Sequence, residues 1–139
     1  GLYGFLRPLD MIQPYRLEMG IKLKNKKAKD LYGFWGSKVT NAINDLAGGD
    51  PIINLASKEY FKVVKKKDLK STLINPVFKE YKNGKYKNIG IFSKQARGLM
   101  TDFIIKNKVE NPEMLKTFNE GKYEYSESKS STDEWVFIR

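Results

Sequence analysis

Two segments of the sequence place a serine and a lysine where a strand is expected to pass into a helix. They are "LASKEYF", which contains Ser57 and Lys58, and "IFSKQAR", which contains Ser93, Lys94 and Arg97. Each serine is expected to cap its helix, and the free N–H groups of a helix start attract anions. Positive side chains are disfavoured in that first turn. The two segments therefore suggest phosphate sites, although solvated bases paired with nearby acids explain the same pattern.

Residues beside these serines fit the same hypothesis. Gly98 follows Arg97 and costs about 1 kcal/mol of helix propensity relative to alanine, which a ligand approaching the backbone closely would explain. In "NLASKEYFK" we expect Lys62 to contact phosphate together with Lys58, and Asn54 and Tyr60 to orient the segment.

Alternating charges interrupt the apolar stretch "GLYGFLRPLDMIQPYRLEMG". They are Arg7, Asp10, Arg16 and Glu18. Buried charges are costly unless paired, so we expect these four to pair at least partly with one another. A planar guanidinium can hold a carboxylate and a phosphate together, and we expect Arg7 and Arg16 to contact phosphate while the two acids orient them. A network that only fixes the turn accounts for the same residues.

The charge of the chain also indicates a polyanion partner. The net charge is +10, and residues 1–109 carry 22 Lys or Arg against 9 Asp or Glu. A basic body of this kind is typical of nucleic-acid binding, but 22 of the 26 bases are lysines, so a lysine-rich proteome is the competing explanation. The chain has no Cys and no His, which removes thiolate chemistry and the commonest metal ligands. We expect no cofactor and no metal.

Signs of catalysis and of membrane attachment are weak. The sequence contains no GxxxxGK[ST], GxGxxG or GxSxG motif. Scattered carboxylates could serve acid–base chemistry, so an enzyme stays the alternative. In "KEYFKVVKKK" and "KEYKNGKYK", aromatic residues are interleaved with lysines, and their rings could stack on nucleic-acid bases. The same alternation also fits an element with one buried and one solvent-exposed face. No apolar run is long enough to span a membrane and no signal peptide is visible, so a cytoplasmic protein is expected.

The elements that must position these residues follow from periodicity and turn signals. We expect a helix that Asp30 caps and Gly48-Gly49 ends, and a hairpin around Asn83-Gly84. The expected strands are residues 2–6, 51–55, 73–81, 85–92, 123–125 and 135–138, and the expected helices are 31–46, a short one after Ser57, one after Ser93 and one from Pro112. The fold class is α/β (α+β mixed), a single compact body with a central mixed sheet flanked by helices.

Three motifs resemble one known family in sequence and in order. "GLYGFLRPLDMIQPYRLEMG", "NLASKEYFK" and "KQARGLMTDFII" resemble the carboxyl-terminal half of the YaaA family of bacterial peroxide-stress proteins. The resemblance implies that residues 1–139 are the carboxyl-terminal part of a YaaA-like domain whose amino-terminal half is absent. That half is then an expected partner, and Leu2, Tyr3 and Phe5 are expected to expose apolar surface toward it.

The resemblance also carries a function. It implies a cytoplasmic DNA-binding protein of the peroxide stress response that limits DNA damage and free intracellular iron. Binding to duplex or distorted duplex DNA is expected through phosphates in a basic cleft, without sequence preference. A helix–hairpin–helix-like element of the family is expected in the absent half. The alternative is an enzyme that acts on a nucleic-acid or phosphorylated substrate through the same cleft.

Overall fold

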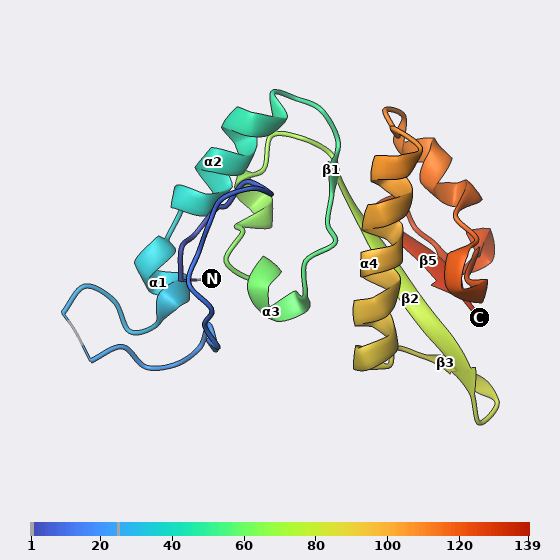
Figure 1. Ribbon diagram of the computed structural model, residues 1–139, viewed down its shortest axis with the longest axis horizontal. Helices are drawn as coiled ribbons and strands as arrows, with labels where there is room; N and C mark the ends of the chain where they lie inside the picture. The colour runs from blue at the N-terminus through green and yellow to red at the C-terminus, as the bar shows by residue number, and fades with distance from the viewer. Residues whose placement is uncertain (1, 25) are drawn as a thin grey trace. The chain divides into compact units, whose positions relative to one another are not determined.

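The longest strand, β2 (Leu73–Lys82), is the central strand of the sheet. Burial alternates along it with the period of two that a strand imposes, and the buried residues are Ile74, Pro76, Phe78 and Glu80. The computed structural model describes residues 2–24 and 26–139. In this part of the chain the strand order is β1-β2-β5-β4, with β3 paired to β2 (Figure 1).

The sheet is mixed. β1 (Ile52–Ile53) and β5 (Glu134–Ile138) run parallel to β2, and β5 places Val136 opposite Val77. β3 (Lys85–Lys87) is antiparallel to β2, and β4 (Glu124–Tyr125) is antiparallel to β5. The expected fold class, α/β with a central mixed sheet, is confirmed.

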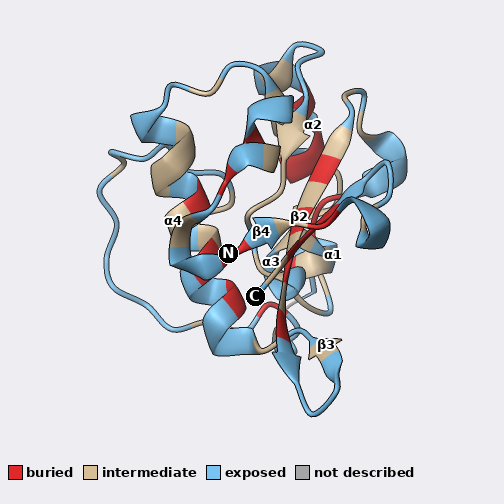
Figure 2. Ribbon diagram, turned by 90° about the vertical axis from the view of Figure 1, so that its right-hand side faces the viewer, coloured by how far each residue is buried: buried red, intermediate tan, exposed pale blue. Residues whose placement is uncertain are grey.

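A long helix, α4 (Gly90–Lys106), packs its apolar stripe against this sheet. The stripe consists of Ala96, Leu99, Met100, Phe103 and Ile104, and all five belong to the same core as Phe78 and Phe137. Figure 2 shows the buried residues along β2 and α4 in red. The 3-10 helix η2 (Pro112–Thr117) adds Leu115 to this core, and two further short 3-10 helices, η3 (Glu120–Lys122) and η4 (Glu127–Lys129), follow it. Among the described helices, none is both long and apolar enough to cross a membrane.

The hairpin between β2 and β3 turns at the predicted dipeptide. Asn83 and Gly84 both have positive φ, 53° and 76°, as a two-residue hairpin turn requires. The second strand is shorter than expected, because it ends at Lys87 and α4 begins at Gly90. The prediction of a strand over residues 85–92 is therefore wrong in its second half.

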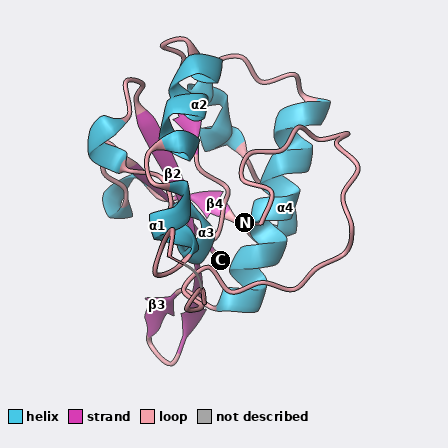
Figure 3. Ribbon diagram, turned by 90° about the vertical axis from the view of Figure 1, so that its left-hand side faces the viewer, coloured by secondary structure: helices cyan, strands magenta, loops and turns pink. Residues whose placement is uncertain are grey.

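The chain divides into two compact units. The first comprises Gly1–Gly49 and Ser57–Ser71, and the second Asp50–Ala56 and Thr72–Arg139, which contains the sheet. In its described residues the first unit has helices and loops but no strand (Figure 3). Its helices are α1 (Leu31–Trp35), α2 (Lys38–Ala47), α3 (Lys58–Phe61) and η1 (Lys66–Asp68). That all 139 residues form part of one domain stays a prediction.

The helix expected over residues 31–46 is two helices. The Asp30 cap is confirmed, because its carboxylate accepts a hydrogen bond from Gly33 N–H, and Gly48 ends α2 in the left-handed conformation. Between them, Gly36 has φ 54° and ψ −117°, which no helix accommodates, so the chain breaks after Trp35. The two helices pack around a small core of Met19, Leu31, Val39, Val63 and Val64.

The strand expected over residues 2–6 does not form. Gly4 has φ 74°, and a Cβ there would lie 2.7 Å from the Trp35 ring, so the backbone turns closely over that ring. A continuous extended strand cannot contain such a turn. The segment is irregular up to Met19, whose side chain enters the core of the first unit.

Candidate nucleic-acid interface

Arg7 and Asp10 form a closed turn in the first unit. The Asp10 carboxylate accepts hydrogen bonds from Arg7 backbone N–H at 2.8 Å and from Arg7 Nε at 3.0 Å, and Nη2 lies 2.8 Å from Oδ1. The Arg7 side chain first, and its backbone N–H second, lower the pKa of Asp10. The predicted pairing is confirmed for these two residues. The Arg7 side chain remains 84% exposed, so its other nitrogens face solvent.

Arg16 and Glu18 make no ion pair with a described residue. Both side chains are exposed, and Glu18 contributes only its backbone carbonyl, which accepts a hydrogen bond from Ile21 N–H at 3.3 Å. The role of Arg16 at phosphate and that of Glu18 in orienting it stay predictions.

The helix start at Ser57 is as predicted. The Ser57 hydroxyl accepts a hydrogen bond from Tyr60 N–H at 3.3 Å, and α3 follows from Lys58. The helix also holds the irregular segment of the first unit, because Tyr60 donates its hydroxyl to the carbonyl of Leu17 at 3.2 Å. Glu59 accepts a hydrogen bond from Met19 N–H at 2.9 Å, so its carboxylate does not pair with Lys58 or Lys62.

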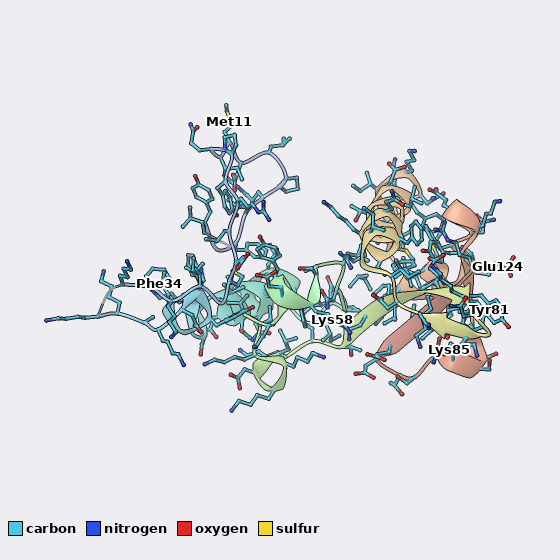
Figure 4. All side chains as sticks on the ribbon, turned by 90° about the horizontal axis from the view of Figure 1, so that it is seen from below. Met11, Phe34, Lys58, Tyr81, Lys85 and Glu124 are labelled. Carbon is cyan, nitrogen blue, oxygen red and sulfur yellow. The ribbon has the colours of Figure 1, made fainter. Side chains whose placement is uncertain are left out.

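Lysines dominate the stretch that begins with this helix. Among the described residues none of them forms an ion pair, and they are Lys58, Lys62, Lys65, Lys66, Lys67 and Lys70. All six are exposed, and Figure 4 labels Lys58 among them. We call them the lysine surface. Their contacts are with neutral groups: the Lys62 ammonium lies 5.0 Å from the Tyr32 ring centroid, and the Lys65 ammonium donates to Ser37 Oγ at 2.9 Å.

The first unit therefore holds most of the net charge. It contains 14 Lys or Arg against 6 Asp or Glu, a net of +8, and the second unit contains 12 against 10, a net of +2. The second unit also neutralises part of its charge in ion pairs, as between Lys106 and Asp102 at 2.5 Å and between Lys116 and Glu113 at 2.7 Å. The Asp102 and Glu113 carboxylates raise the pKa of these two lysines through their hydrogen bonds.

Ser93 is not a helix cap, which corrects the sequence prediction. α4 begins at Gly90 with Ile89 as its N-cap residue, and Ser93 N–H already donates to the Ile89 carbonyl at 2.9 Å inside the helix. The serine is buried, and its hydroxyl donates to the Phe78 carbonyl of β2 at 3.4 Å. Packing against the sheet therefore satisfies this hydroxyl, and it is not left for the helix start.

Lys94 and Arg97 consequently lie inside α4, as its fifth and eighth residues. The argument that a bound anion explains positive charge in the first turn does not apply to them. Lys94 is exposed and Arg97 is half-buried, and neither makes an ion pair with a described residue. A Cβ at Gly98 would meet nothing within 4 Å, so the fold itself does not require glycine there.

Asn54 joins two strands. Its Nδ2 donates to Asn75 Oδ1 of β2 at 2.8 Å, and its Oδ1 accepts from Ala56 N–H at 3.1 Å. Asn75 donates in turn to the carbonyl of Asp133, just before β5. These contacts hold the edge of the sheet. That Asn54 orients a phosphate-binding segment stays a prediction.

Sequence reasoning missed a buried polar group in the second unit. Glu80, on the buried face of β2, accepts a hydrogen bond from the Tyr123 hydroxyl and another from Arg139 Nε at 2.6 Å. Arg139 also donates to the Gly121 carbonyl at 2.9 Å. Burial first, and the hydrogen bond to Glu80 second, raise the pKa of Tyr123 well above its ordinary range. The signal was an acid at a buried position of the alternating strand, but its partners are 43 and 59 residues away.

The β2–β3 hairpin carries a second group of exposed lysines beside an aromatic pair. The Tyr81 and Tyr86 rings lie edge to face with centroids 5.2 Å apart, and Tyr81 is 61% exposed. Exposed lysines without an ion pair to a described residue surround them, and they are Lys82, Lys85 and Lys87. Figure 4 labels Tyr81 and Lys85 on this hairpin. The segment "KEYKNGKYK" thus exposes both lysine side chains and an aromatic ring.

The predicted phosphate contacts belong to different units. Arg7, Arg16, Lys58 and Lys62 are in the first unit, and Lys94 and Arg97 are in the second. A basic cleft that unites them stays a prediction. The described residues contain no group of three or more His, Cys, Asp or Glu side chains that could hold a metal ion.

Comparison with known proteins places these features in a family. The family model described as peroxide stress protein YaaA matches residues 1–129. The chain is 55% identical over 142 aligned residues to a UPF0246 protein of Saccharophagus degradans, and 52% identical to UPF0246 proteins of Neisseria gonorrhoeae and Colwellia psychrerythraea. Each alignment covers the whole chain but only 55–56% of the relative, so the chain spans little more than half the length of these relatives. The resemblance seen in the three sequence motifs is thereby confirmed, and the chain belongs to the peroxide stress protein YaaA family.

Proposed function

We propose that this protein limits DNA damage during peroxide stress by binding DNA phosphates without sequence preference in the cytoplasm. Family membership supports the link to peroxide stress. The lysine surface carries the DNA part of the proposal, because six exposed ammonium groups without a described acidic partner are a source of positive potential. Because the chain spans little more than half of its relatives, the proposal concerns the contribution of this part of the protein.

Lysines of this kind suit phosphate contacts better than base readout. An ammonium group is a point charge that pairs with phosphate oxygens and reads no base edge, so binding should depend on salt and little on sequence. Arg7 adds a guanidinium that faces solvent, with one side already held by Asp10. The hairpin lysines supply a second phosphate-binding group, and Lys94 and Arg97 are further basic residues of the second unit.

The resemblance implies a low level of free intracellular iron as a second effect of the family. We include that effect in the proposal as one of the whole protein. The effect on iron requires no iron ligand in this chain. Shielding DNA and lowering free iron both reduce the same DNA damage.

Fluorescence anisotropy with labelled duplex DNA across a salt series tests the DNA proposal. Each phosphate contact contributes about −0.9 to the slope of log K against log salt, so replacing Lys65, Lys66 and Lys67 with alanine should flatten it by up to about 2.7. Two duplexes of unrelated sequence should bind equally. Lys67→Ala should flatten the slope by about 0.9, whereas Lys106→Ala should leave it unchanged because Asp102 already neutralises that ammonium.

The same assay defines failure. Absence of binding at low salt, or binding that the three lysine changes do not weaken, would refute the proposal. Cleavage of the duplex during incubation would instead favour an enzyme that acts on nucleic acid.

A further inference from the structure

The first residues of the chain expose an unusual amount of apolar surface. Leu9 is 94% exposed and Met11 is 99% exposed, and Figure 4 shows Met11 at the outer end of its loop, pointing away from the ribbon. The large apolar side chains of this loop that are exposed by more than a third are Leu2, Tyr3, Phe5, Leu6, Leu9, Met11, Ile12 and Tyr15. We call them the apolar surface. Soluble proteins rarely leave such a continuous group of apolar side chains uncovered.

This surface is fixed to the first unit and is not a loose tail. The Tyr3 and Tyr15 rings lie edge to face with centroids 5.4 Å apart, which closes the loop on itself. Its far end is tied to α3 by the hydrogen bonds from Tyr60 to Leu17 and from Met19 to Glu59. A partner therefore meets a shape that is already formed, which lowers the entropy cost of binding.

The charge of the apolar surface does not suit a polyanion. Residues 2–21 contain two arginines and two acids, a net charge of zero, and one arginine is paired with Asp10. The lysine surface of the same unit carries six bases and is the better match for nucleic acid. The occupant of the apolar surface should accordingly be an apolar protein surface.

The greater length of the relatives indicates which protein segment occupies the apolar surface. About 44% of the Saccharophagus degradans relative lies outside its match to this chain, and about 45% of the Neisseria gonorrhoeae relative does. A segment in the same polypeptide binds at high effective concentration and needs no separate encounter. We propose that the apolar surface is the docking site for the part of the full-length protein that this chain does not span.

Co-expression tests the proposal. The 139-residue chain carries an affinity tag, and its partner is the polypeptide from the Saccharophagus degradans relative that lies outside the 142-residue match. We expect the polypeptide to co-purify at close to one copy per chain. The double variant Leu9→Asp/Met11→Asp should lower the recovered polypeptide at least tenfold, because two charges would then have to be buried.

Ile105→Asp is the matched control. Ile105 is 69% exposed, lies in α4 of the second unit and is outside the apolar surface, so this change should leave recovery unaltered. Circular dichroism melting of the double variant without the polypeptide should give the same midpoint as the unaltered chain, since Leu9 and Met11 are almost fully exposed.

Four outcomes would overturn the proposal. The first three are failure of the polypeptide to co-purify, equal recovery with the double variant, and equal loss with Ile105→Asp. The fourth is a marked fall in melting midpoint caused by Leu9→Asp/Met11→Asp alone. Such a fall would show that this surface packs against the chain's own residues. A homodimer in sedimentation that the double variant dissolves, without polypeptide binding, would make a second copy the occupant. None of these results depends on DNA binding, so the test stands apart from the proposed function.

Discussion

The Asp10 carboxylate holds Arg7 at both its backbone N–H and its guanidinium, with three N–O distances between 2.8 and 3.0 Å. The pair closes the turn from Arg7 to Asp10, which contains Pro8 and Leu9. The Arg7 side chain is 84% exposed and that of Asp10 is half-buried, so solvent screens the pair, which orders a local segment and contributes little to global stability.

Titration of Asp10 should show this pairing directly. Its pKa lies below the ordinary value of 3.8 because the Arg7 side chain and then the Arg7 backbone N–H favour the charged form. A lowered pKa in the folded state contributes stability above the ordinary pKa, and this contribution is lost as pH falls through the lowered value. NMR titration of the carboxyl carbon should give a midpoint below 3.8, and Arg7→Gln should move it back toward 3.8. Equal midpoints in the two proteins would rule out the pair.

Tyr123→Phe should destabilise the second unit. The change removes the hydroxyl that donates to Glu80 and leaves a buried carboxylate oxygen without that partner, which costs about 1–3 kcal/mol. Urea unfolding followed by circular dichroism measures the loss. Tyr125→Phe is the control, because the Tyr125 ring packs on Trp135 and Phe137 but its hydroxyl makes no hydrogen bond with a described residue. Equal effects of the two changes would contradict a special role for Glu80.

Two glycines should respond in opposite directions to alanine. Gly121 has φ 62°, and a Cβ there would lie 2.9 Å from Leu99 Cδ1, so Gly121→Ala should cost about 1–2 kcal/mol. Gly98 lies inside α4 with open space around the Cβ position, so Gly98→Ala should add about 0.5–1 kcal/mol of stability. Urea midpoints of the two variants give both signs. A loss of stability in Gly98→Ala would show that the helix needs glycine at that point.

Gly98→Ala also tests the reading of that residue as a point of close ligand approach. If a phosphate approaches the backbone there, the variant should be more stable and yet bind duplex DNA more weakly. Unchanged DNA affinity would leave Gly98 without a role at the interface.

Local signals predicted the features that depend on neighbouring residues. The Asn83-Gly84 turn and the caps at Asp30 and Ser57 each involve residues within three positions of one another, and all three form as expected. Ser93 shows the limit of this reasoning. Its hydroxyl had two possible partners, and the carbonyl of Phe78, 15 residues away in the sheet, is the one it contacts.

Contacts between residues far apart in the chain could not be predicted from the sequence, for the same reason. Nothing near Glu80 indicates that Tyr123 and Arg139 meet it, because those contacts arise only when β2 and β5 pair and η3 packs beside them. The same limit applies to the candidate nucleic-acid interface. Its residue types are visible in the sequence. The lysine surface, however, depends on two features of the fold: Glu59 bonds to Met19, and the six lysines have no described acidic partner.

Tyr81 on the β2–β3 hairpin exposes its ring to solvent. If the hairpin contacts a strand with accessible bases, the exposed ring of Tyr81 should stack on a base, an interaction worth about 1–3 kcal/mol. Tyr81→Ala should then weaken binding of a labelled single-stranded oligonucleotide by about 5- to 100-fold. Fully paired duplex offers no free base face, so its binding should change much less. Tyr81→Phe keeps the ring and should bind both forms as the unaltered protein does.

The lysines of the hairpin should behave differently from its tyrosine. Replacing Lys82 and Lys85 with alanine removes phosphate contacts, which should weaken the binding of both DNA forms. The salt slope should flatten by up to about 1.8 for duplex and about 1.4 for single strand. Anisotropy in parallel salt series on the two DNA forms separates the two effects. If Tyr81→Ala and the lysine changes both leave binding intact while the Lys65, Lys66 and Lys67 variant loses it, DNA contacts only the lysine surface. In that case the exposed ring pair serves the hairpin itself, as the T-shaped contact between Tyr81 and Tyr86 would allow.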